Sequence, residues 1–256
     1  FESLDTILRE EVGRVRGDIK EIPFIGGLLG YIEYDAGISI NKVNCYRSPT
    51  SIYKNSCYLG VYPWAIIQDH KEKKTILASL SSFSIKDHHD LVLRLRDTRF
   101  TSARYKNFKL RTPFKSNMTR SKYRAAFEKA MKYIHEGDCY QINLAQRFSA
   151  EYSGDPWLAY QILRAVSASP YSAFIKDIER SAILCLSPER FLSFENGLVK
   201  TSPIKGTRPR KEDPIEDRKQ VSELSCSEKD RAENIMIVDL LRNDLGKTCT
   251  TGSIKV

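Results

Sequence analysis

The sequence predicts an α+β fold. Strand-like and helix-like segments are mixed along its 256 residues, without the regular strand–helix–strand alternation of a doubly wound parallel sheet. Two hairpins are expected: apolar runs at 64–68 and 75–80 flank a polar turn at 69–74, and Asn196-Gly197 separates two short apolar runs. An apolar content of 41% is enough for a substantial core.

The first part of the chain is expected to be rich in strands and to lead into a basic segment. Strand-like signals extend from about residue 26 to 80, and a short helix is expected at 87–95. Residues 94–124 contain eleven Lys or Arg and a single acid. Their weak periodicity favours an exposed connection over a groove-reading helix, so we expect no nucleic-acid partner. A soft boundary near residue 112 separates regions 1–112 and 113–256.

Two long helices are expected in the second part. Thr119 can cap a helix that runs to about Glu136 and stops at Gly137, because apolar residues recur there at spacings of three and four. Ser227 can cap a helix that runs towards Gly246, because an acid follows three residues later, as in a capping box. The elements expected between them are a strand at 139–150, a helix at 157–167 and short strands at 171–175, 182–186, 191–194 and 198–201.

Composition argues against several classes of protein. No apolar run approaches the roughly 20 residues that a membrane-spanning helix needs. The chain starts at Phe1 without a secretory leader pattern, so we expect a fragment of a cytoplasmic protein. The six cysteines form no CxxC pair, which argues against a zinc site and against a disulfide framework.

Three segments carry the residue types that catalysis requires. Residues 202–210 read Ser-Pro-Ile-Lys-Gly-Thr-Arg-Pro-Arg and place a primary amine, that of Lys205, between a proline and a glycine in a strand-like run. Residues 187–191 read Ser-Pro-Glu-Arg-Phe and supply a carboxylic acid, that of Glu189. Residues 227–234 open the last helix with closely spaced carboxylates. An amine, an acid and neighbouring carboxylates together suggest an enzyme.

These segments, with Gly-Asp-Cys-Tyr-Gln-Ile-Asn-Leu-Ala-Gln-Arg-Phe at 137–148, resemble the chorismate-utilising enzymes and, within that family, the first components of aminodeoxychorismate synthases. Order and spacing match from about Phe114 to the end, and the glycine-rich residues 23–31 are similar to the family's N-terminal region. The resemblance implies a core like that of anthranilate synthase component I, a β-sandwich of two sheets with surrounding helices, apparently truncated at both ends. Region 1–112 would be a partial N-terminal region and 113–256 a partial chorismate-binding catalytic domain.

The resemblance implies amination of chorismate at C4 to 4-amino-4-deoxychorismate, on the route to p-aminobenzoate and folate. Lys205 would be the nucleophile that forms a covalent adduct at C2, which requires its amine to be unprotonated. Glu189 would be the general acid that helps the C4 hydroxyl to leave. From residue type alone, Lys205 would be a solvated charge and Glu189 an exposed acid or a partner of Arg190.

Asp230 and Glu233 are candidates for holding a metal ion. They lie three residues apart on the expected helix and therefore on one face. Such a pair suits Mg²⁺, which takes hard oxygen ligands and often only one or two protein carboxylates. By resemblance Glu233 is a direct ligand and Asp230 a nearby, water-mediated partner. The alternative for Asp230 is an acid that complements the helix dipole.

Three more residues are candidates for binding substrate: Gln141, Gly206 and Thr207. Gln141 stands where related isochorismate and salicylate synthases place a lysine base, and a glutamine cannot deprotonate water, so we expect no water-adding reaction. The Gly206 amide and the Thr207 hydroxyl could bind a substrate carboxylate. A structural hydrogen bond for Gln141 and a simple turn at Gly206 and Thr207 remain open as alternatives.

The resemblance also implies partners and rival functions. Ammonia would come from a separate glutaminase subunit, with no membrane partner. Anthranilate synthase component I is one alternative, although those enzymes typically have an alanine at the position of Lys205. A second alternative is a non-catalytic, truncated remnant that only binds the glutaminase subunit. The third, a nucleic-acid-binding module built on the basic segment 94–124, ranks last.

Overall fold

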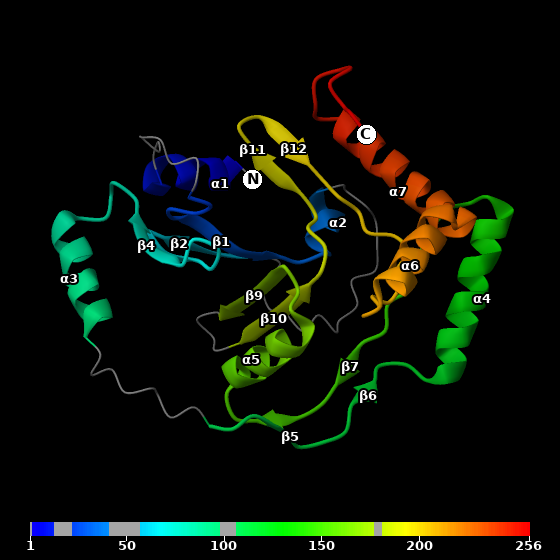
Figure 1. Ribbon diagram of the computed structural model, residues 1–256, viewed down its shortest axis with the longest axis horizontal. Coiled ribbons are helices and arrows are strands. Elements are labelled where there is room, and N and C mark those ends of the chain that lie inside the picture. The colour runs from blue at the N-terminus through cyan, green and yellow to red at the C-terminus, as the bar shows by residue number, and fades with distance from the viewer. Residues whose placement is uncertain (1, 13–21, 41–56, 98–105, 177–180) are drawn as a thin grey trace. The chain divides into compact units, whose positions relative to one another are not determined.

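Helices and strands are mixed along the chain in the computed structural model, which describes residues 2–12, 22–40, 57–97, 106–176 and 181–256 (Figure 1). The predicted α+β class is confirmed. Each described strand pairs with one antiparallel neighbour, so a sandwich of two larger sheets stays a prediction. The described residues fall into two units, unit 1 up to residue 97 and unit 2 from residue 106 onward. The boundary near residue 112 likewise stays a prediction.

In the part of unit 1 that the structure describes, there are two antiparallel strand pairs. Its elements are α1 (Glu2–Ile7), the π-helical turn η1 (Leu8–Val12), β1 (Gly27–Ile32), α2 (Ala36–Ile40), β2 (Cys57–Tyr62), β3 (Trp64–Asp69), β4 (Lys74–Ser79) and α3 (Ile85–Arg96). β1 pairs with β2 and β3 with β4. The helices α1 and α2 and the turn η1 were not expected, whereas α3 contains the helix predicted at 87–95.

The hairpin β3–β4 confirms the strand pair predicted around a polar turn. Trp64 lies opposite Ser79, and Asp69 opposite Lys74. One Asp69 carboxylate oxygen accepts the backbone N–H groups of Lys71 and Glu72, each at 2.9 Å, and so closes the turn. At the other end of the hairpin Ala78 and Leu80 are buried.

The described residues of unit 2 form four strand pairs and four helices. Its strands are β5 (Lys109–Leu110), β6 (Lys115–Ser116), β7 (Phe148–Ser149), β8 (Tyr152–Ser153), β9 (Tyr171–Lys176), β10 (Ala182–Ser187), β11 (Ser193–Glu195) and β12 (Leu198–Lys200). Its helices are α4 (Arg120–Glu136), α5 (Pro156–Ser167), α6 (Pro214–Cys226) and α7 (Glu228–Gly246). The pairs are β5–β8, β6–β7, β9–β10 and β11–β12. None of the helices in the described ranges is long and apolar enough to cross a bilayer.

Helix α5 lies against the β9–β10 pair (Figure 1), and an aromatic cluster joins them. The ring of Trp157 lies 5.5 Å from that of Tyr160 and 5.1 Å from that of Phe174 on β9. Tyr160 and its neighbour Ala159 are buried. Apolar area removed from water at this cluster is the main stabilisation that α5 gains, because the helix has little other buried surface.

Helix ends follow the local signals of the sequence. The Thr119 hydroxyl accepts the N–H of Lys122 at 3.3 Å and begins α4, and Gly137 ends it in the left-handed conformation, with φ of 81°. The Ser227 hydroxyl likewise accepts the N–H of Asp230 at 3.3 Å and begins α7. Asn196 and Gly197 both have positive φ between β11 and β12, as a tight hairpin turn requires. These predictions are confirmed.

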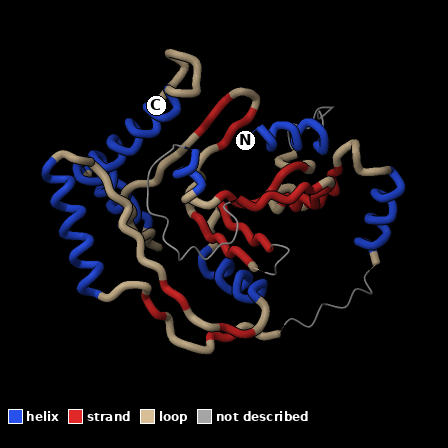
Figure 2. The backbone as a smooth tube through the Cα atoms, turned by 180° about the vertical axis from the view of Figure 1, so that it is seen from behind, coloured by secondary structure: helices blue, strands red, loops and turns tan. Residues whose placement is uncertain are grey.

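The strand predicted at 139–150 was largely wrong. Only Phe148 and Ser149 pair, opposite the short strand β6, and the side chain of Asn117 accepts the N–H of Arg147 at 3.0 Å where the ladder ends. Residues 139–147 form loop or bend, as Figure 2 shows, and none of them belongs to a backbone ladder with a described strand. Beside β6 the contact is made by a side chain, since Nε2 of Gln146 donates to the hydroxyl of Ser116 at 2.6 Å.

Two more differences concern the segment after β12. Residues 201–211 form no strand, since Pro203 and Pro209 lack the N–H that a ladder needs and Gly206 has a φ of 73°. The helix α6 was not expected, although Asp213 caps it and Pro214 stands at its first turn, a pattern visible in the sequence.

The Lys and Arg residues of the basic segment are exposed wherever the structure describes them. This holds for Arg94, Arg96, Lys106, Lys109, Arg111, Lys115, Arg120, Lys122 and Arg124. Arg99 and Arg104 lie outside the described residues. Within the segment, Arg124 forms an ion pair with Glu128 one turn further along α4.

Candidate active site

Lys205 lies in the irregular loop 201–211 between β12 and α6, and its side chain is half-buried. The next residue, Gly206, lies directly against the helices. A Cβ atom at this position would be 2.9 Å from the Cβ and Cγ atoms of Asp230 on α7 and 2.9 Å from Cδ1 of Leu224 on α6. The space and the positive φ both require glycine, so the backbone beside Lys205 is fixed at the junction of these helices.

Arg208 ties the same loop to both helices. Its Nη2 donates to Oδ2 of Asp230 at 3.1 Å and its Nε donates to Oε1 of Glu223 at 3.1 Å. The side chains of Arg208 and Asp230 are only 25% and 15% exposed, whereas that of Glu223 is 61% exposed. The interaction with Asp230 is therefore the better shielded of the two.

The charges at this junction shift each other's pKa. A hydrogen bond from the Ser227 side chain lowers the pKa of Asp230; partial burial opposes this, and the Arg208 guanidinium lowers it further. The hydrogen bond to Glu223, followed by the charge of Asp230, raises the pKa of Arg208 above its ordinary value. Asp230 is therefore a carboxylate and Arg208 a cation at neutral pH.

A second arginine fixes the end of the loop. Arg210 donates to both carboxylate oxygens of Asp217, from Nε and Nη2, each at 2.9 Å, in a bidentate pair. The N–H of Lys211 adds a third hydrogen bond to Asp217, also at 2.9 Å. The hydrogen bond from Arg210, and then that from Lys211, lowers the pKa of Asp217. The loop that carries Lys205 is thus held at two points, Arg208 and Arg210.

Glu189 follows the end of β10 and is half-buried. The Ser187 hydroxyl donates to the Glu189 carbonyl oxygen at 2.7 Å and accepts the Glu189 N–H at 3.3 Å, so the backbone here is held in a local turn. In the part of the chain that the structure describes, Glu189 forms no ion pair with Arg190, whose guanidinium lies 5.7 Å from the centre of the Tyr171 ring. The alternative of an Arg190 partner is therefore not observed.

The remaining predicted residues are exposed. Glu233 lies one turn after Asp230 on α7, and Gln141 lies in the loop 139–147. Thr207 is exposed, and its carbonyl oxygen accepts a hydrogen bond from Nη1 of Arg208 at 3.0 Å. The structure brings the Lys205 loop into contact with Asp230, but no hydrogen bond or ion pair among the described residues links this loop to Glu189, Gln141 or Glu233.

The donor set at α7 is small. No cluster of three or more His, Cys, Asp or Glu residues occurs within the described ranges. Two carboxylates one helical turn apart can still fit Mg²⁺, which commonly completes its coordination with water and substrate oxygens. Of the two, Glu233 has no ion-pair partner among the described residues, whereas Asp230 already accepts from Arg208.

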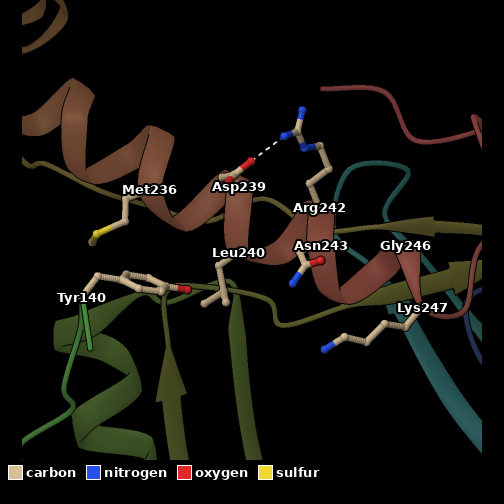
Figure 3. Close-up of a pocket in the computed structure, with 8 residues that line it drawn as sticks. All are labelled: Tyr140, Met236, Asp239, Leu240, Arg242, Asn243, Gly246 and Lys247. Carbon is tan, nitrogen blue, oxygen red and sulfur yellow. Dashed lines mark hydrogen bonds and ion pairs between the residues drawn. The ribbon is translucent and has the colours of Figure 1, made fainter. Parts of the chain in front are cut away.

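Sequence reasoning missed Glu223 and a cavity beside α7. The cavity has a volume of about 770 Å³ and is lined by Tyr140, Met236, Asp239, Leu240, Arg242, Asn243, Gly246 and Lys247. Figure 3 shows the Tyr140 ring on the same side of α7 as Met236 and Leu240, while Asp239 and Arg242 point away and pair with each other. The sequence offered one signal for this cavity: Tyr140 immediately precedes Gln141, a predicted substrate-binding residue.

Residues 3–256 match the family described as chorismate binding enzyme. The chain therefore belongs to the chorismate-binding enzyme family. It is 43% identical, over 249 residues, to aminodeoxychorismate synthase component 1 of Escherichia coli, covering 94% of this chain and 52% of that protein. It is 32% identical to anthranilate synthase component 1 of Aquifex aeolicus, covering 91% of this chain and 49% of that protein.

The fold is similar to that of a solved relative. The crystal structure of anthranilate synthase component I from Streptococcus pneumoniae matches with a TM-score of 0.77 and 31% sequence identity, covering 95% of this chain and 55% of that one. The chain thus spans about half the length of the curated relatives that it matches.

Proposed function

We propose that this chain carries part of the active site of an enzyme that aminates chorismate at C4, giving 4-amino-4-deoxychorismate for p-aminobenzoate and folate synthesis. The observation that carries the proposal is the fixed position of Lys205, on a loop held against α7 through Gly206 and Arg208. Sequence identity of 41–43% to three proteins named aminodeoxychorismate synthase component 1 supports this reaction over others in the family.

Lys205 is the nucleophile in this proposal. Its neutral amine attacks C2 of chorismate, and the C4 hydroxyl leaves as water after receiving a proton from the Glu189 carboxyl group. Ammonia then adds at C4 and the lysine amine departs from C2, while Glu189 takes up a proton. Glu189 is half-buried and follows the end of β10, where the Ser187 hydroxyl holds its backbone in a local turn.

The substrate is a dianion, so the site must supply positive charge and hydrogen-bond donors. The Gly206 N–H and the Thr207 hydroxyl are proposed to bind one carboxylate, and the Gln141 amide to contact the ring. Glu233 is proposed to hold Mg²⁺, which when bound neutralises a substrate carboxylate. Gln141 lacks a basic group, so addition of water at C2 is not expected.

Ammonia is proposed to come from a glutaminase partner, because relatives that bear the designation component 1 imply a second component. A cytoplasmic location, and the absence of nucleic-acid and membrane partners, remain predictions of the same proposal.

Product analysis tests the proposal. The chain is incubated with chorismate, Mg²⁺ and ammonium, with and without an aminodeoxychorismate lyase, and Lys205→Ala serves as control. We expect p-aminobenzoate only when the lyase is added and only with Lys205 present. Anthranilate formed directly would instead establish the first alternative, anthranilate synthase component I, which the similarity to such enzymes also supports.

A second candidate function is a non-catalytic chain that only binds the glutaminase subunit. No turnover, combined with co-purification with a glutaminase component, would support this candidate over the enzyme.

A further inference from the structure

Both the carboxylate and the backbone N–H of Asp230 form hydrogen bonds with other residues of the chain. Its Oδ2 accepts from Nη2 of Arg208 at 3.1 Å, and its backbone N–H donates to the hydroxyl of Ser227, the helix cap. Its Cβ and Cγ atoms also form the surface on which Gly206 lies. Three elements therefore meet at this one side chain: the cap of α7, the body of α7 and the loop that carries Lys205.

A direct metal ligand would have to share this carboxylate with a guanidinium. A divalent cation beside Arg208 would be repelled by a positive charge that is only 25% exposed and therefore incompletely screened. Glu233, one turn further along α7, is exposed and has no ion-pair partner among the described residues. The two carboxylates of the helix thus have different surroundings: Asp230 is paired with an arginine, and Glu233 is exposed.

We propose that Asp230 is a positioning residue, not a metal ligand. Through Arg208 and Gly206 it holds the loop on α7 and so fixes the main chain at Lys205, leaving metal binding to Glu233. The assignment of metal binding to Glu233, the metal half of this inference, rests on the proposed function. The claim that Asp230 anchors the loop on α7 does not.

Position 208 requires arginine because its guanidinium group binds two carboxylates, one on each of two helices, at the same time. Nε donates to Glu223 on α6 and Nη2 donates to Asp230 on α7, so one rigid fork joins both helices to the loop. Lysine carries its charge at a single atom and cannot reproduce this fork. Arg208→Lys is therefore expected to restore part of the anchor, and Arg208→Gln none of it.

Hydrogen exchange of the loop 201–211, followed by mass spectrometry, tests the anchor. We expect Arg208→Gln and Asp230→Asn each to accelerate exchange several-fold, with little further effect in the double variant, because either change breaks the same contact. Asp239→Asn is the matched control, an aspartate on α7 whose ion pair with Arg242 lies outside this junction. It should leave the exchange of the loop unchanged.

The rate at which Lys205 is acetylated gives a second test of the anchor, because it reports how accessible the Lys205 amine is. In Arg208→Gln and Asp230→Asn we expect faster acetylation of half-buried Lys205, while that of Lys200, already exposed on β12, stays the same. Thermal unfolding of each variant establishes that the chain is still folded, and Arg208→Lys provides the milder change should Arg208→Gln unfold it.

Calorimetric titration with Mg²⁺ alone tests the metal half. We expect Glu233→Gln to lose binding and Asp230→Asn to retain it within several-fold. Loss of binding in Asp230→Asn, with unchanged loop exchange, would overturn the inference. If the unaltered chain binds no Mg²⁺, the assignment of Glu233 and the metal part of the proposed function fail together, while the exchange experiment still decides the anchor.

Discussion

Nη2 of Arg208 lies 3.1 Å from Oδ2 of Asp230, and this contact joins the loop after β12 to the first turns of α7. The two residues are 22 positions apart in the sequence. Because Lys205 is on the same loop, the contact determines where the proposed nucleophile can lie.

Gly206→Ala should destabilise unit 2 and displace the loop. The new methyl group would lie 2.9 Å from atoms of Asp230 and Leu224, at a φ of 73° that alanine adopts only at a cost. We expect a loss of at least about 1–3 kcal/mol in the free energy of unfolding, measured by urea denaturation.

Gly137→Ala is the matched control, because Gly137 has a similar φ of 81° and no atom within 4 Å of an added Cβ. It should show the conformational cost alone. Equal losses in the two variants would mean that Gly206 is not packed against the helices.

Asp217 should make stability depend on pH in the acid range. Its pKa in the folded chain is lowered, chiefly by the hydrogen bond from Arg210, so its contribution is complete above the unfolded value of 3.8 and is lost as the pH falls through the lower folded value. Thermal unfolding of the unaltered chain and of Asp217→Asn should therefore differ at neutral pH and converge in strong acid. A difference that persists unchanged at the lowest pH would contradict this account.

Tyr160→Ala should remove most of the aromatic cluster on α5. Tyr160 is 5% exposed and its ring lies 5.5 Å from those of both Trp157 and Phe174. Large-to-small changes at such sites cost about 3–5 kcal/mol, which chemical denaturation would detect. Val166→Ala, on the same helix but 85% exposed, should change the free energy of unfolding by less than about 0.5 kcal/mol. Similar losses in both would show that α5 is not packed as described.

Glu189→Gln should slow amination of chorismate, if Glu189 is the general acid of the proposed function. An amide cannot donate a carboxyl proton, and loss of such a group typically costs about 10²- to 10⁴-fold in rate. Steady-state formation of aminodeoxychorismate, coupled to a lyase, measures the effect. Glu195→Gln, at an exposed hairpin position, is the control and should keep the unaltered rate. A Glu189→Gln enzyme with full activity would remove Glu189 from the mechanism.

Elements that depend on neighbouring residues were predictable from the sequence. The cap at Thr119, the stop at Gly137 and the cap at Ser227 each depend on groups within four positions along the chain. The turn at Asn196-Gly197 needs only two residues that tolerate positive φ. The segments that contain Lys205 and Glu189 were also recognisable, because their identity and order, and not their positions in space, indicated the family.

The tertiary structure decided the features that depend on distant partners. Residues 139–147 alternate as a strand would, yet they form loop, and none of them joins a backbone ladder with a described strand. Asp230 and Glu233 lie three residues apart on one face of α7, and the ion pair with Arg208 is a feature of Asp230 that the spacing did not predict. Residue types and spacing thus determined the helix ends and the candidate chemistry. Contacts between segments far apart in the chain decide which carboxylate is bound by an arginine and where Lys205 is held. Only folding brings these segments together.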